Sequence, residues 1–176
     1  LRDGYASISP DGTKVAFYAY YDGGKTWSIH TMNIDGTERK RITNKSKVWD
    51  ASPSWSPDGK LIAFSRKEDG FYKVMVMNSD GTSIRQLKMP FAVNPKFTKK
   101  FEIVYTSHWE SHAEIFISDT TGQNIRQLTD NDFEDGGPEV SPCGTKVAFF
   151  STRDGNSEIY TMDIDGSNQT RLTNNN

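Results

Sequence analysis

The residues best suited to chemistry lie in one short segment, His108-Trp109-Glu110-Ser111-His112, with Glu114 just beyond it. Imidazole and carboxylate groups at alternate positions share one side of an extended strand, and they are the ligand types of a zinc site. A metal-dependent hydrolase centred on His108, Glu110 and His112 is therefore one alternative for the function. The segment aligns without a gap with Thr152 to Gly155, which look like a hairpin tip, where chain reversal scatters side chains. We therefore favour a surface hairpin and predict no metal site.

Other catalytic and ligand-binding patterns are absent or incomplete. No Gly-x-Ser-x-Gly elbow and no phosphate-binding Gly-x-x-x-x-Gly-Lys-Ser/Thr loop occur in the chain. Asp163-Ile164-Asp165-Gly166 resembles part of a calcium loop, but Leu172 stands where that loop needs a glutamate. His30 aligns with apolar and aromatic residues of the other repeats and is expected in the core. Cys143 is the single cysteine and is expected on the surface, as a substitution in a turn. We predict no cofactor.

Composition excludes several classes of protein. The chain has 176 residues and a formal net charge of -2, with 21 Lys plus Arg against 23 Asp plus Glu, so no polybasic nucleic-acid footprint is present. No apolar run approaches the roughly 20 residues that span a bilayer, so no membrane insertion is expected. Aromatic residues make up 12% of the chain, and glycine and proline are frequent, a balance typical of short strands joined by tight turns.

The dominant signal is internal repetition. Ser9-Pro10-Asp11-Gly12 and the strand after it recur at Ser56-Pro57-Asp58-Gly59 and at Ser141-Pro142-Cys143-Gly144. The last two copies lie 85 residues apart, twice the repeat length, and the segment from Phe97 to Tyr105 is the degenerate copy between them. A second marker ends in Gly36, Gly81, Gly122 and Gly166, in constant phase with the first. The chain therefore consists of four repeats, at about 1–44, 45–89, 90–130 and 131–176, in a single domain.

Each repeat is expected to form four short strands, A to D, with A innermost. Strand A is predicted at Tyr5–Ser9, Pro53–Ser56, Pro95–Thr98 and Pro138–Ser141, and strand B at Lys14–Tyr18, Leu61–Ser65, Glu102–Thr106 and Lys146–Phe150. Strand C is predicted at Ser28–Asn33, Lys73–Asn78, Glu114–Asp119 and Glu158–Asp163, and strand D at Arg41–Thr43, Gln86–Lys88, Gln127–Thr129 and Arg171–Thr173. Strands B and C are apolar on both faces, so the sheets must stack face to face, as in the blades of a propeller.

The repeat resembles the WD40-like repeat of TolB-type β-propellers, over essentially the whole chain. The second repeat carries the full pattern in Asp50, Pro53, Trp55, Ser56, Pro57, Asp58 and Gly59, whereas the third lacks the Pro-Asp-Gly turn. The resemblance implies an all-β fold, either a closed four-bladed ring or part of a larger propeller. It also implies a bacterial or archaeal protein, often extracytoplasmic, whose propeller docks another component of the cell envelope.

Two sets of residues are singled out. The structural set comprises the turn residues Pro10, Asp11, Gly12, Pro57, Asp58, Gly59, Pro142 and Gly144, the core residue Trp55, and three aspartates expected to bond loop backbone, Asp3, Asp50 and Asp135. The second set lies in or beside the loops from strand D to the next strand A, and comprises Trp49, Asp50, Phe91, Phe133 and Glu134. The three aromatics either fill the seams between blades or anchor a partner.

These features favour a non-catalytic scaffold that binds a protein or peptide on the face formed by the D–A loops. Two alternatives from other classes stay open beside it. One is enzymatic, as the metal-dependent hydrolase or as the gating propeller of a serine peptidase, whose hydrolase domain is not in this chain. The other is structural, with the four blades associating with a second copy to complete a larger ring.

Overall fold

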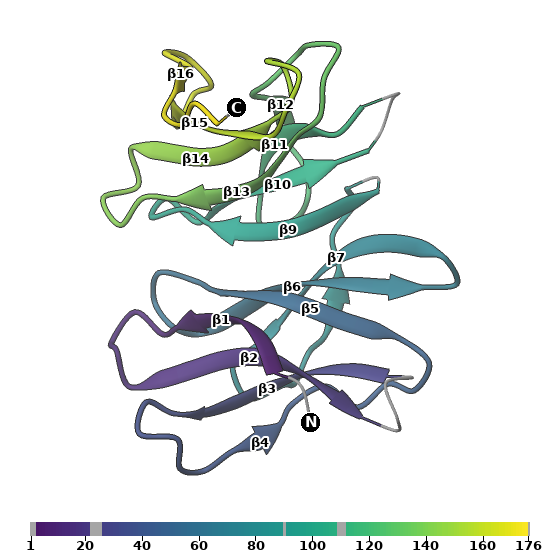
Figure 1. Ribbon diagram of the computed structural model, residues 1–176. Coiled ribbons are helices and arrows are strands. Elements are labelled where there is room, and N and C mark those ends of the chain that lie inside the picture. Colours follow the sequence, from purple (N-terminus) through teal and green to yellow (C-terminus); the bar gives the residue numbers. More distant parts are fainter. Residues whose placement is uncertain (1–2, 22–25, 90, 109–111, 176) are drawn as a thin grey trace.

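The computed structural model describes residues 3–21, 26–89, 91–108 and 112–175 (Figure 1). These residues form strands and turns without a helix, which confirms the predicted all-β class. Four blades follow one another along the chain, each of four antiparallel strands. Their bounds are β1(Asp3–Ile8), β2(Lys14–Tyr21), β3(Thr26–Asn33) and β4(Lys40–Arg41) in blade 1, and β5(Trp49–Trp55), β6(Leu61–Glu68), β7(Phe71–Asn78) and β8(Arg85–Gln86) in blade 2. Blade 3 contains β9(Ala92–Phe97), β10(Glu102–Ser107), β11(Glu114–Asp119) and β12(Arg126–Gln127), and blade 4 contains β13(Asp135–Val140), β14(Lys146–Ser151), β15(Glu158–Asp163) and β16(Thr170–Arg171).

The blades are stacked in chain order, from blade 1 at the bottom of Figure 1 to blade 4 at the top. Blades 1 and 2 join into one sheet through a single parallel bridge between Trp27 and Trp49, whereas blades 3 and 4 are separate four-stranded sheets. Consecutive blades are in contact, but among the described strands none of blade 1 contacts a strand of blade 4. The described part of the chain is therefore an open arc of four blades.

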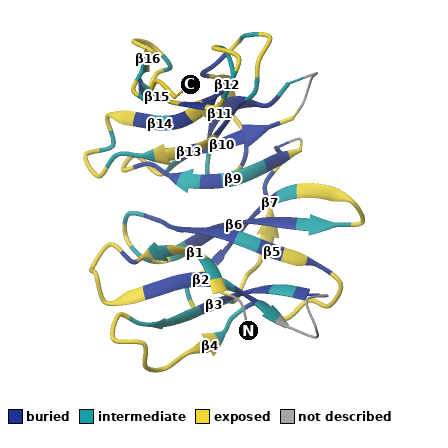
Figure 2. Cartoon of the chain, viewed as in Figure 1, coloured by how far each residue is buried: buried dark blue, intermediate teal, exposed yellow. Residues whose placement is uncertain are grey.

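Apolar clusters fill each of the three seams between blades (Figure 2). In every seam, one blade contributes small and aliphatic side chains and the next contributes large aromatic ones. The first seam places Ala16 and Ile29 against Phe64, the second places Ala63 and Val74 against Tyr105, and the third places Val104 and Ile115 against Phe149. Each fully buried side chain of this size contributes roughly 1.5–3 kcal/mol relative to an exposed one. The two-sided apolar pattern of strands B and C is thus explained by stacking.

The two end faces of the arc differ. On blade 4, Phe150, Ile159 and Leu172 are exposed on the face that would meet a following blade, although their counterparts in the other blades lie in the seams. On blade 1, Phe17 lies on the face that would meet a preceding blade, and it is nonetheless buried. The guanidinium of Arg39 covers its ring, 4.9 Å from the centroid. Blade 1 therefore covers part of its outer face with its own side chains, although Ile8, which pairs with Val15 on that face, is 59% exposed.

The turn between strands A and B is held by its own side chains. In blade 1, the Ser9 hydroxyl donates to the Asp11 carboxylate at 2.6 Å and accepts the Lys14 N–H at 2.9 Å, and the same contacts recur around Ser56 and Asp58. The hydrogen bond from Ser9, followed by those from the Thr13 N–H and hydroxyl, lowers the pKa of Asp11 to about 2. Gly12, Gly59 and Gly144 follow at positive φ, and the prolines before them begin each turn. The motif therefore fixes how strand B leaves strand A.

Three local features differ from the sequence prediction. The turn of blade 3, which lacks Pro-Asp-Gly, is one residue shorter than the others, with Phe101 in the left-handed region at φ 59° and Thr98 in place of the serine. Strands B and C extend farther toward their connecting loop than predicted in blades 1 and 2: β2 runs to Tyr21 and β3 starts at Thr26, and β6 runs to Glu68 and β7 starts at Phe71. Each strand D is only two residues long.

The glycine of the second repeat marker has a role that turn chemistry alone did not predict. In blade 2, the Cβ of an alanine at Gly81 would lie 2.5 Å from the carbonyl oxygen of Ile42 in blade 1. Gly122 and Gly166 approach the backbone of the preceding blade in the same way, at Lys88 and Leu128. The matching Gly36 of blade 1, which has no preceding blade among the described residues, faces open space. This glycine therefore lets the edge of one blade lie against the backbone of the blade before it.

Gly81→Ala and Gly36→Ala form a matched pair that separates backbone strain from seam packing. Both sites have a positive φ, 90° and 86°, so alanine costs about 1–2 kcal/mol at either. At Gly81 the new methyl group must also displace the neighbouring blade, which adds about 1–3 kcal/mol of overpacking. Urea unfolding of both variants measures the difference. Equal losses of stability would contradict the seam role of Gly81.

Candidate interaction face

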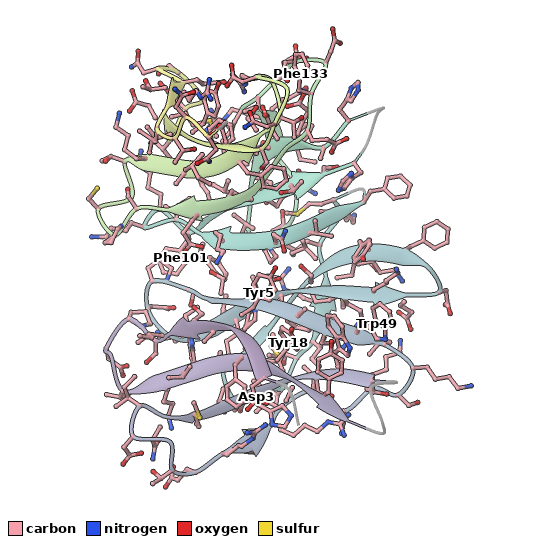
Figure 3. The ribbon with its side chains drawn as sticks, viewed as in Figure 1. Asp3, Tyr5, Tyr18, Trp49, Phe101 and Phe133 are labelled. Atoms are coloured by element: carbon pink, nitrogen blue, oxygen red, sulfur yellow. The ribbon has the colours of Figure 1, made fainter. Side chains whose placement is uncertain are left out.

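The D–A loops and the B–C hairpins lie on one edge of the arc. Strands B and D run in the same direction in each blade, so the chain leaves both at the same edge. We call this edge the D–A face; its described residues are the D–A segments 42–49, 87–89, 91 and 128–134 and the hairpin residues 67–72, 108, 112–113 and 152–157. Figure 3 shows Trp49 and Phe133 on this side and Phe101, from an A–B turn, on the other.

Three aromatic side chains predicted on this face are partly exposed. The exposed fractions are 40% for Trp49, 48% for Phe91 and 43% for Phe133. They come from three successive D–A segments, so they are spread along the arc over all four blades. An aromatic ring held on a rigid scaffold and half open to solvent is the kind of side chain that dominates protein–protein interfaces.

Trp49 fills a seam and also remains exposed. Its ring stacks on Trp27 of blade 1, with centroids 5.0 Å apart and planes inclined by 10°. Trp27 stacks in turn on Tyr18. The ring centroids of Tyr18 and Tyr5 are 5.9 Å apart, and Tyr5 is exposed on β1, the innermost strand of blade 1. Trp49 therefore fills a seam, which is the first role considered for the loop aromatics, and leaves part of its ring open to solvent. The Trp27–Trp49 bridge locks its position, because the backbone of both residues is paired there.

Phe91 and Phe133 have different surroundings. The ring centroid of Phe91 lies 6.4 Å from that of Phe71, the first residue of strand β7, and both side chains are exposed. Phe133 lines an open groove of about 420 Å³ together with His112, Glu114, Gln127, Asp130, Asn131 and Asp132. The Asn131 side chain accepts the Phe133 N–H at 3.0 Å, which fixes the backbone of this loop.

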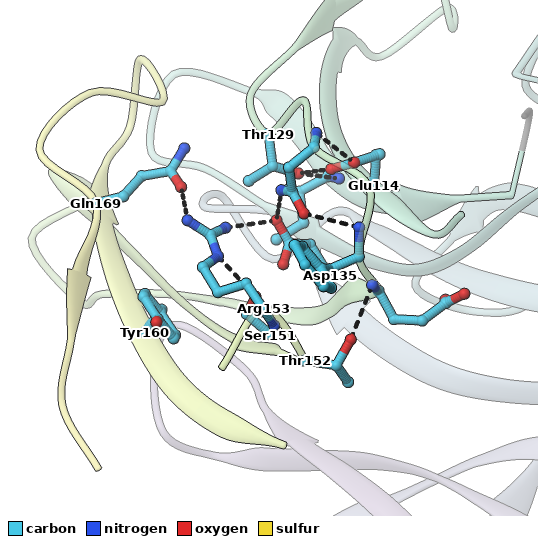
Figure 4. A network of polar contacts seen from close by, with 12 residues as sticks. Glu114, Thr129, Asp135, Ser151, Thr152, Arg153, Tyr160 and Gln169 are labelled. Atoms are coloured by element: carbon cyan, nitrogen blue, oxygen red, sulfur yellow. Dashed lines mark hydrogen bonds and ion pairs between the residues drawn. The ribbon is translucent and has the colours of Figure 1, made fainter. Parts of the chain in front are cut away.

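A polar network holds the loop that carries Phe133 (Figure 4). The Glu114 carboxylate accepts the Thr129 hydroxyl and, at 2.9 Å, the Asn131 N–H. Burial raises the pKa of Glu114, and the nearby Asp135 and Asp130 act in the same direction. Glu134 accepts the Ala113 N–H at 3.1 Å, which joins the loop to the start of strand β11. The described contact of the Glu134 carboxylate is thus with backbone.

The three repeat aspartates pair with arginines, not with loop backbone as the sequence suggested. Asp50 accepts two hydrogen bonds from Arg66, at 2.7 and 2.8 Å, and both side chains are buried. Asp135 is buried and binds Arg153 at 2.8 Å, and also accepts from the side chain of Asn131. Asp3 forms a bidentate pair with Arg39 near the surface. No local sequence signal indicated these partners, because each arginine occupies a different position in its blade.

Trp55 and the remaining candidates are also placed. Trp55 is buried in the first seam, and its indole N–H donates to the Ser7 carbonyl of blade 1 at 3.1 Å. His30 is buried against Phe17, and burial lowers its pKa to about 4, with Arg39 and Arg41 contributing. Cys143 is exposed in its turn between Ser141 and Thr145.

The segment considered for a metal is described only in part. Trp109, Glu110 and Ser111 lie outside the described residues. Within the described ranges, no three His, Cys, Asp or Glu side chains are arranged to hold a metal ion. His108 is exposed, whereas Glu114 is buried and engaged by Thr129 and Asn131. In the part of the chain that the structure describes, no helix has the length and apolar character needed to cross a bilayer.

The protein consists of stacked four-stranded blades that are apolar on both faces, with the loops gathered at one edge. These features define it as a β-propeller or a part of one. Residues 4–176 match the TolB β-propeller domain family, and the chain belongs to that family. It is 29% identical over 161 residues to a TolB homologue of Chlorobium luteolum, covering 91% of this chain and 36% of the relative. The chain therefore spans about a third of the length of that curated relative.

Solved structures show the same fold. TolB from Acinetobacter baumannii superposes with a TM-score of 0.86 at 20% identity, over 98% of this chain and 43% of that chain. A puromycin-hydrolysing peptidase of Mycobacterium tuberculosis superposes with a TM-score of 0.75 at 18% identity, over 98% of this chain and 31% of that one. At these identities the likeness concerns the fold alone, and it is shared by a TolB protein and a peptidase.

Asp50→Ala should destabilise the protein strongly, because it leaves the Arg66 guanidinium buried without its carboxylate. Removing one member of a buried ion pair costs about 3–5 kcal/mol. The matched change Asp3→Ala removes a pair near the surface and should cost about 0–1 kcal/mol. Urea unfolding measures both. The double change Asp50→Leu with Arg66→Met should recover most of the loss; a small effect of Asp50→Ala alone would show that the pair is not structural.

Cys143 should react with iodoacetamide at lower pH than an ordinary thiol. Hydrogen bonds with Ser141 and then Thr145 stabilise the thiolate and lower the pKa of Cys143 to about 7. The alkylation rate, followed by mass spectrometry between pH 5 and 10, should therefore rise with a midpoint near that value. Ser141→Ala should move the midpoint upward, and an unchanged midpoint would contradict the assigned cause.

Proposed function

We propose that this chain is a non-catalytic β-propeller scaffold that binds a protein or peptide partner through its D–A face. The observation that carries the proposal is the partial exposure of Trp49, Phe91 and Phe133, one on each of three successive D–A segments. Three large aromatic side chains on one edge of a rigid arc provide anchors at fixed spacing for a chain laid along that edge.

Asp50 and Glu134 support this face without forming its contact surface. Asp50 follows Trp49 directly and is bound to Arg66 beneath it, so it fixes the strand that presents the indole. Glu134 follows Phe133 and is bonded to the backbone of Ala113. Both residues act by holding the loops in place. A site built this way needs little rearrangement on binding, which favours affinity.

The enzymatic alternatives gain less support. The peptidase resemblance is one of fold, and the hydrolase motifs sought in the sequence are missing from this chain. Association with a second copy, the structural alternative, would act through the exposed outer face of blade 4, at Phe150, Ile159 and Leu172. Neither alternative makes use of the aromatic side chains on the D–A face, which is why we place the scaffold function first.

The triple variant Trp49→Ala, Phe91→Ala, Phe133→Ala tests the face directly. We expect it to lose at least tenfold in partner capture, because each buried anchor of an interface contributes about 2 kcal/mol or more. The measurement is a pull-down from lysate, quantified against the unaltered chain. Tyr5→Ala combined with Phe101→Ala is a control that removes exposed aromatics outside this face. A triple variant that folds and captures the same partners to the same extent would refute the assignment.

A further inference from the structure

Blade 2 presents two aromatic rings and a lysine in direct register across three strands. Trp49 on β5 is opposite Lys67 on β6, and Lys67 is opposite Tyr72 on β7. The Lys67 ammonium lies 5.1 Å from the centroid of the Trp49 ring and 5.0 Å from that of Tyr72. Directly opposed residues point to the same side of a sheet, so the three side chains form one continuous surface at the D–A face.

A small cavity opens beside this surface. It has a volume of about 180 Å³ and is lined by Lys47, Trp49, Lys67, Asp69 and Gly70. That volume is below the roughly 300 Å³ of a small-molecule pocket and suits a single side chain of a partner. The cavity joins the D–A loop, through Lys47, to the tip of the blade 2 hairpin, through Asp69 and Gly70.

Within the described ranges, the two lysines of the cavity differ from the neighbouring Lys45 and Lys73 in having no carboxylate partner. Lys45 and Lys73 both pair with Glu68. Among the described residues, neither Lys47 nor Lys67 has a carboxylate oxygen within 4 Å. Two ammonium groups against the one carboxylate of Asp69 leave the cavity with a positive balance. An incoming carboxylate would therefore gain charge-assisted hydrogen bonds at little cost to existing pairs.

The charge on the D–A face reverses farther along the arc. Phe71 follows Tyr72 on β7 and therefore points to the other side of blade 2, where its ring centroid lies 6.4 Å from that of Phe91; the two side chains are exposed by 58% and 48%. The groove around Phe133 is lined by Glu114, Asp130 and Asp132, without a lysine or arginine. An acidic ligand is therefore attracted to the blade 2 end of the face and repelled from its other end.

We infer that the blade 2 end of the D–A face binds an acidic segment of a partner polypeptide. A carboxylate side chain of that segment lies between Lys47 and Lys67, and an adjacent apolar side chain packs on Trp49 and Tyr72. This inference rests on the proposed function and adds the chemistry of the partner. A polypeptide fits better than a nucleic acid, because a polyanion running along the face would meet the carboxylates around Phe133.

A random peptide library displayed on phage is the probe. It is selected in parallel on four immobilised proteins: the unaltered chain, Lys47→Glu with Lys67→Glu, Lys99→Glu with Lys100→Glu, and the Trp49, Phe91, Phe133 triple alanine variant. The second lysine pair is the matched control, since it is exposed on an A–B turn and its reversal changes the net charge equally. Circular dichroism and urea unfolding establish that each variant is folded before selection.

The unaltered chain should enrich peptides with Asp or Glu next to an aromatic or aliphatic residue, and so should the Lys99, Lys100 variant. The Lys47, Lys67 variant should recover at least tenfold fewer of these peptides. Enriched peptides without acidic residues, or acidic peptides retained by the Lys47, Lys67 variant, would overturn the inference and leave the scaffold function standing. Equal enrichment by the triple alanine variant would contradict the scaffold function itself.

A fluorescent oligothymidylate of twelve nucleotides tests whether the site binds a nucleic acid instead of an acidic polypeptide. We expect no saturable binding at 150 mM salt, by fluorescence anisotropy. Saturable binding that is lost in the Lys47, Lys67 variant and kept in the Lys99, Lys100 variant would assign the site to nucleic acid and overturn the peptide inference.

Discussion

Every blade of this protein is apolar on both faces, and the rest of the structure depends on stacking those faces. A lone four-stranded sheet with Ile62 and Phe64 on one side and Ala63 and Val74 on the other could not keep both sides from water. Stacking places a small-residue face against an aromatic face in each of the three seams, and the edge glycines let the blades approach to backbone contact. Stability is therefore shared between neighbouring blades, as in other repeat proteins.

The same stacking produces the D–A face. Strands B and D of every blade end at one edge, so the loops of successive blades gather there in a row. Trp49 shows how closely seam and surface are connected, since it stacks on Trp27 of the blade before it and still exposes part of its ring. Its position is determined by backbone pairing, ring stacking and the buried Asp50–Arg66 pair together. A contact surface built on such residues is rigid because the fold depends on them.

Much of the fold could be predicted from sequence, because the repeat is written in local signals. Ser-Pro-Asp-Gly marks a turn by backbone preference, and alternating apolar residues mark a strand buried on both sides. The features that could not be predicted depend on contacts between distant residues. The partners of Asp3, Asp50 and Asp135 are arginines at three different repeat positions, so no alignment of the blades reveals them. Phe101 occupies a left-handed position that local preference assigns to glycine. The loop aromatics were predicted as candidates, but only the structure shows how far each is exposed.

Charge along the D–A face bears on how a partner would be oriented. Lys47 and Lys67, which have no carboxylate partner among the described residues, lie at blade 2, and the carboxylates of the Phe133 groove are at the junction of blades 3 and 4. The charge at each end of the face is small, and a single exposed ion pair contributes at most about 1 kcal/mol. A segment with a carboxylate at the blade 2 end and a basic side chain at the Phe133 end would gain from the aromatic anchors between them, and reversing its direction would place like charges together at both ends. The fixed spacing of the blades would thus convert weak local charges into a preference of such a segment for one direction of binding, because only one orientation satisfies both ends at once.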